Sequence, residues 1–107
     1  MNRLLVYQLV LQFRGDSLAD YDAMVALETE LIAELADSAK VDGHDVGSGE
    51  TNIFIFTADP VRTFRQAMVV LERKRCLGAV TAAHRPALGE EYTVIWPEGF
   101  SGEFRVA

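Results

Sequence analysis

One short segment of the chain collects the residue types that most often do chemistry. Residues 41–56 read VDGHDVGSGETNIFIF, and Asp42 and His44 lie two positions apart in it. On an extended strand such a pair projects from one face. A carboxylate beside an imidazole orients the ring and raises its basicity, which general-base catalysis and metal binding both use. His84 would join the pair if the sheet order brings its strand close, so Asp42, His44 and His84 are the candidate catalytic residues.

A tight hairpin explains the same segment without any catalysis. Residues 40–47 and 51–57 are predicted to be strands joined by a glycine-containing turn around Ser48–Glu50. In the expected register, Asp42, His44 and Val46 share a face with Ile53 and Ile55, and Gly43, Asp45 and Gly47 share the other face with Phe54 and Phe56. Turns and strand ends are rich in Asp, Ser and Gly. We therefore favour structural or solvated roles for both histidines.

Other motifs do not define a cofactor site. GSGETN lacks the Gly-x-Gly-x-x-Gly frame and leads into a strand, so no helix terminus is expected to hold a phosphate. The histidines have neither HxH nor HExxH spacing. Cys76 is the single cysteine and is expected to be a buried structural thiol. We expect neither a metal nor a cofactor.

The charge is unevenly distributed along the chain. Residues 16–37 contain seven acids and no base, whereas residues 62–75 contain five bases and one acid. The net charge of -6 argues against nucleic-acid binding, which requires Lys and Arg to neutralise phosphates. The acidic segment is either neutralised by the basic one or free to attract a basic protein partner. The candidate partner-binding residues are Glu28, Glu30 and Glu34.

Size and composition indicate one domain spanning residues 1–107. Half of the residues are hydrophobic and 24% are charged, as in ordinary globular proteins. No stretch is long and apolar enough for a membrane span, and Gln8 and Gln12 interrupt the first apolar run, which favours a strand over a signal peptide. A lone cysteine gives no reason to expect an oxidising compartment, so we expect a cytoplasmic protein without membrane contact.

Periodicity predicts the remaining elements. Residues 4–13 alternate as a strand. Residues 18–38 are predicted to form a helix that opens with a capping box at Ser17 and Asp20. The apolar residues at helical spacing in it are Leu18, Tyr21, Met24, Val25, Leu27, Leu31, Ile32 and Leu35. A second helix is predicted to begin at Asp59-Pro60 and to close at Gly78. Strands are predicted over residues 79–84 and 91–97.

This order of elements resembles the ferredoxin-like, or split βαβ, fold over residues 3–85. The expected fold class is an α+β, ferredoxin-like βαββαβ sandwich with an additional C-terminal strand, and two helices on one face of an antiparallel sheet. Such folds host unrelated activities, so function must be argued from sites. In regulatory domains similar to the ACT group, the first strand-to-helix junction binds amino acids, which would place a ligand at Gly15–Leu18.

The second face of the sheet is also expected to be apolar. It would carry Val6, Val10 and either Ile53/Ile55 or Phe54/Phe56. Because apolar sheet faces avoid water, the C-terminal tail, a second copy or a ligand is expected to cover it.

Our leading hypothesis for this cover is a homodimer of a non-catalytic interaction module, resembling the dimeric α+β barrel group. The alternative is a small enzyme or ligand-binding protein with a pocket over the sheet. His44 would then be the base, Asp42 would orient it, and the walls would come from Tyr7, Trp96 or Phe54.

Overall fold

The computed structural model describes residues 7–15, 21–47 and 49–106. The elements in chain order are β1 (Tyr7–Arg14), α1 (Tyr21–Leu35), β2 (Ala39–Gly47), β3 (Glu50–Thr57), α2 (Pro60–Arg73), the short 3-10 helix η1 (Leu77–Ala79), β4 (Val80–Pro86) and β5 (Thr93–Trp96). The strands form one sheet in the order β2-β3-β1-β4-β5, and each neighbouring pair is antiparallel. The predicted α+β class is confirmed.

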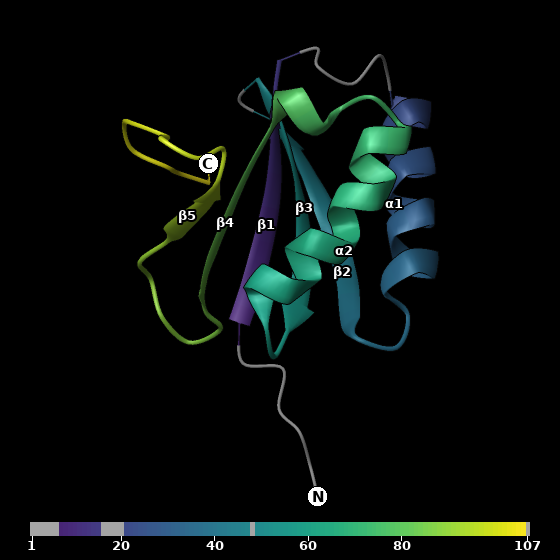
Figure 1. The fold of residues 1–107 in the computed structure, drawn as a ribbon. Coiled ribbons are helices and arrows are strands. Elements are labelled where there is room, and N and C mark those ends of the chain that lie inside the picture. Colours follow the sequence, from purple (N-terminus) through teal and green to yellow (C-terminus); the bar gives the residue numbers. More distant parts are fainter. Residues whose placement is uncertain (1–6, 16–20, 48, 107) are drawn as a thin grey trace, which may run out of the picture.

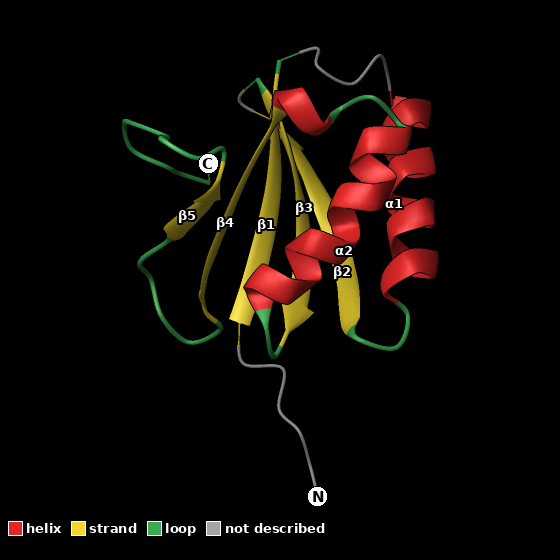
Figure 2. Ribbon diagram, in the orientation of Figure 1, coloured by secondary structure: helices red, strands yellow, loops and turns green. Residues whose placement is uncertain are grey.

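Both helices pack on the same side of the sheet (Figures 1 and 2). The register places Leu9 opposite Ile55 and Leu11 opposite Ile53, and all four side chains are fully buried. The core-facing positions of α1 are Met24, Leu27, Leu31 and Leu35. Burial of each such side chain stabilises the fold by roughly 1.5–3 kcal/mol. The apolar layer between helices and sheet therefore holds the two together.

The start of α2 is as predicted, but its end is not. The Asp59 side chain accepts a hydrogen bond from the Arg62 backbone N–H at 3.1 Å, and Pro60 is the first helical residue. The prediction that Gly78 closes the helix is wrong, because α2 ends at Arg73 and Gly78 lies in η1. Arg75 adopts a φ of 60° instead, and the N–H of Cys76 reaches back to the Leu71 carbonyl. This is a Schellman-type ending without glycine.

The β2–β3 hairpin contains a bulge that the sequence analysis missed. Val41 pairs with Ile55 and Gly43 pairs with Phe54, so Asp42 has no partner in the ladder. Gly43 has a φ of 152°, which side-chain-bearing residues rarely adopt. The register predicted for Asp42 is therefore wrong, because the bulge interrupts the alternation at that residue.

The helix-free face of the sheet carries Phe54 and Phe56, not Ile53 and Ile55. These two rings lie on the side of Val10, whereas the isoleucines face the helices. The last strand joins the same sheet, because β5 pairs with β4. The chain that follows β5 reaches this face, where Gln12 Nε2 donates to the Arg105 carbonyl at 2.7 Å.

Some expectations concern residues outside the described ranges. They are the start of the first strand with Val6, the capping box at Ser17 and Asp20, most of the proposed amino-acid site at Gly15–Leu18, and Ser48 of the hairpin turn.

Candidate functional site

The imidazole of His44 is held by a carboxylate of α1. His44 Nδ1 lies 3.1 Å from Glu28 Oε1 and 3.2 Å from Glu28 Oε2. The Tyr21 ring meets the imidazole edge-on, with the ring centroids 6.0 Å apart. The Glu28 side chain is only 15% exposed and that of His44 is 28% exposed. This arrangement orients the imidazole and joins β2 to α1.

Asp42 does not take part in this arrangement. It is the exposed residue of the bulge, and its side chain makes no hydrogen bond or ion pair with another residue in the described ranges. The carboxylate–imidazole pair expected within β2 is therefore replaced by one between an α1 carboxylate and β2. Sequence spacing could not reveal it, because Glu28 and His44 come from different elements.

His84 lies in a separate environment. Its strand, β4, is separated from β2 by β1 and β3, which corresponds to roughly 14 Å at the usual strand spacing. The Tyr7 ring contacts it edge-on, with the centroids 5.7 Å apart. Its Nδ1 is buried without a hydrogen-bond partner in the part of the chain that is described, and burial lowers the pKa of the ring. The structure does not bring the two histidines together.

The proposed pocket walls also lie apart. Phe54 is on the helix-free face, whereas Trp96 packs beside Phe64 of α2, with the ring centroids 5.9 Å apart. Tyr7 is beside His84. These three aromatic side chains therefore do not enclose His44.

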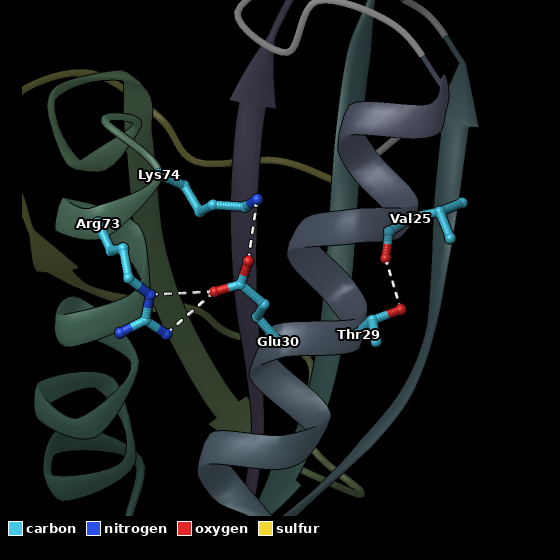
Figure 3. Close-up of polar contacts among 5 residues, drawn as sticks. All are labelled: Val25, Thr29, Glu30, Arg73 and Lys74. Carbon is cyan, nitrogen blue, oxygen red and sulfur yellow. Dashed lines mark hydrogen bonds and ion pairs between the residues drawn. The ribbon is translucent and has the colours of Figure 1, made fainter.

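Two of the three candidate partner-binding carboxylates are used within the chain. Glu28 holds His44, and Glu30 pairs with Arg73 at 3.0 Å and with Lys74 at 2.9 Å (Figure 3). Hydrogen bonds from Lys74 and Arg73 hold the pKa of Glu30 below its ordinary value. Glu34 is exposed and has no polar partner among the described residues. The expected neutralisation between the two helices is thus concentrated on Glu30.

An exposed apolar stripe on α1 was missed by the sequence analysis. Tyr21, Val25 and Ile32 are 62%, 36% and 52% exposed. The signal was available, because the apolar positions assigned to this helix cover more of its circumference than one core-facing side can bury. The helix therefore presents exposed apolar side chains to solvent in addition to its carboxylates.

Two surface hollows accompany these features. One, of about 310 Å³, lies between α1 and β2 and is lined by Ile32, Ala36, Ala39, Lys40 and Val41. The other, of about 420 Å³, lies beside β5 and is lined by Glu90, Glu91, Tyr92, Val94, Gly102, Glu103 and Phe104. Neither is lined by Asp42, His44 or His84.

No family of known proteins and no curated protein matches this sequence. Within the described ranges, no three potential ligands among His, Cys, Asp and Glu gather closely enough to hold a metal ion. In the same part of the chain, neither helix has the length and apolar character required to cross a bilayer.

Proposed function

We propose that this chain is a non-catalytic module that acts by association, and that two copies pair through the helix-free face of the sheet. One observation carries the proposal. At the centre of this face Val10 and Ala83 are buried, and around them Phe54, Phe56 and Val94 remain half-buried in the single chain. An apolar centre is what protein interfaces require.

Polar side chains surround this centre. The half-buried ones on the same face are Gln8, Gln12, Thr81 and Arg85. Gln12 Nε2 already donates to Glu50 at 3.1 Å, to Asn52 at 3.0 Å and to the Arg105 carbonyl. Burying this amide nitrogen in an interface would therefore cost little desolvation free energy. An apolar centre with a polar rim supports a face-to-face pair.

The fold that we propose for this module is ferredoxin-like, extended at one edge by β5. Support comes from the neighbours β2-β3-β1-β4, in which each helix connects a central strand to an edge strand of that group. The unpaired Cys76 thiol, which is only 5% exposed, supports a reducing, cytoplasmic location. In this proposal α1 stays available to a basic protein partner.

Sedimentation equilibrium tests the pairing. We expect a mass of about twice 11.8 kDa, and we expect Phe54→Glu to return the chain to the monomer mass, because a carboxylate cannot enter an apolar interface without a partner. Val69→Glu on α2, where the valine is 51% exposed, is the matched control and should still pair. Circular dichroism of both variants shows whether they fold. A folded wild-type chain that remains monomeric at high concentration contradicts the proposal.

A second candidate function is small-molecule binding, with or without catalysis. The hollow beside β5 favours it, because about 420 Å³ lies within the usual range of ligand sites. Tyr92→Ala, in the lining of this hollow, should then weaken binding of a small ligand. Alanine substitution of Asp42, His44 and His84, which do not line it, should cost at most local stability.

A further inference from the structure

An apolar surface runs along the junction of α1 and the sheet edge. It comprises Tyr21, Val25 and Ile32 of α1 and Val41 and Val46 of β2, and we name it the α1–β2 flank. The three α1 side chains lie on one side of the helix, because residues four and seven apart occupy neighbouring turns. Val46 is 59% exposed. The core uses other positions of α1, so Tyr21, Val25 and Ile32 are not part of it.

The flank is hollowed at one end, and the Glu28–His44 pair lies within it. The hollow of about 310 Å³ between Ile32 and Val41 opens at the C-terminal end of α1. Nearer the other end, the Thr29 hydroxyl donates to the Val25 carbonyl at 2.8 Å, so it is turned to the backbone (Figure 3). Figure 3 also shows Val25 on the side of α1 opposite Glu30 and its basic partners. The salt bridges of Glu30 therefore do not obstruct the flank.

The edge of β2 is unsuited to an added strand. The bulge leaves Asp42 unpaired, and Gly43 holds a φ of 152° beside it. Lys40 and Asp42 place exposed charges along the same edge. Bulges and charged side chains are the features that prevent edge-to-edge pairing. An occupant of the flank is thus better accommodated as a helix lying along α1, over a length of about 22 Å for its 15 residues.

The charge around the flank selects a basic occupant. Asp22 of α1 and Asp42 in the bulge of β2 are exposed beside it, and Lys40 is the base that lines the hollow. Glu28, within the flank, is held by His44. A second copy would bring the same excess of carboxylates in a chain whose net charge is -6. Opposite charge steers association and like charge opposes it.

We propose that the α1–β2 flank is a docking groove for a basic amphipathic helix of a partner protein. This inference rests on the proposed function, since it names the partner chemistry that α1 accepts. The apolar stripe of the helix would cover Val25 and Ile32 and enter the hollow, and its Lys or Arg side chains would face the aspartates. Such helix-in-groove recognition uses anchors spaced three and four residues apart.

A matched pair of peptides tests the groove. Both peptides are as long as α1 and carry leucine at helical spacing. All remaining positions are lysine in one peptide and glutamate in the other. We expect the lysine peptide to bind and its affinity to fall as salt rises. We expect Ile32→Glu to weaken binding at least tenfold, and Val69→Glu on α2 to leave it unchanged.

The two histidines of the chain give an independent readout. Imidazole proton NMR signals from His44, which contacts Tyr21 in the flank, should shift on peptide addition, whereas those of His84 should not. Asp22→Lys should weaken binding of the lysine peptide and strengthen binding of the glutamate peptide.

Three outcomes would overturn the inference: equal binding of both peptides, an unchanged affinity in Ile32→Glu, or loss of self-association in Ile32→Glu without peptide. The last outcome would assign the flank to a second copy of the chain. A wild-type monomer that binds the lysine peptide would refute only the pairing through the sheet, so the two proposals fail separately.

Discussion

Among the single residues, His84 carries the clearest pH dependence. Its Nδ1 is buried without a partner in the described chain, and burial lowers its pKa in the folded state. Stability from the neutral ring is therefore complete above the unfolded histidine pKa of about 6.5 and is lost as pH falls through the folded-state pKa. We expect urea unfolding to show a smaller loss of stability below that pH in His84→Leu than in the wild type. Equal losses would show that the ring is not selectively neutral when folded.

Arg75 is the residue whose backbone conformation fits its side chain least. Its φ is 60°, at the end of α2. A left-handed conformation costs a side-chain-bearing residue about 1–2 kcal/mol, whereas glycine adopts it freely but loses about 0.5–1 kcal/mol of chain entropy. Arg75→Gly should therefore raise the free energy of unfolding by about 0.5–1 kcal/mol in chemical denaturation. Arg65→Gly, inside α2, is the contrasting control and should lower it by about 1 kcal/mol. A destabilised Arg75→Gly chain would contradict this account of the helix end.

On the scale of elements, the bulge of β2 depends on one backbone angle. Gly43 has a φ of 152° and Gly47 has no such angle, although a methyl group would meet open space at both. Gly43→Ala should destabilise the chain by roughly 1–3 kcal/mol, the usual cost of a strained backbone position. Gly47→Ala should have little effect, and denaturant unfolding of the two variants measures the difference. Similar losses in both would mean that the bulge does not depend on glycine.

Local sequence signals were sufficient for most elements. The Asp59-Pro60 start of α2, the alternation of β1 and the glycine turn of the hairpin each depend on neighbouring residues, and the structure contains these elements. The predicted end of α2 was misplaced because Gly78 is the obvious stop signal. The chain instead leaves the helix at Arg75, and the next residue, Cys76, is buried. The bulge at Asp42 was missed because a ladder interruption depends on pairing with β3.

The candidate site depended on contacts that sequence spacing does not encode. Asp42 and His44 were paired by proximity in the chain, but the partner of His44 comes from α1. Glu30 was predicted to bind a protein partner, but it forms ion pairs with Arg73 and Lys74 at the end of α2. The exposure of Ile32 follows from which side of α1 meets the sheet, and this is decided by the whole core.

For the molecule as a whole, the fold separates the two surfaces for which we propose association. The helix-free face is an apolar centre with a polar rim, and the α1–β2 flank lies beside the helices on the other side of the sheet. Because the sheet lies between them, a second copy on one surface does not occlude the other. A homodimer would therefore present two equivalent flanks to partners, and simultaneous engagement of both would raise the apparent affinity.

Pairing through the sheet also links thermal stability to concentration, because only the folded state dimerises. Each tenfold rise in protein concentration stabilises the dimer by about 1.4 kcal/mol. Two chains of 107 residues unfold with an entropy of about 0.45 kcal/mol/K, from about 2.1 cal/mol/K per residue. The midpoint measured by calorimetry should therefore rise by about 3 °C per tenfold increase. Phe54→Glu should abolish this dependence and Val69→Glu should retain it, whereas a concentration-independent wild-type midpoint would contradict pairing through the helix-free face.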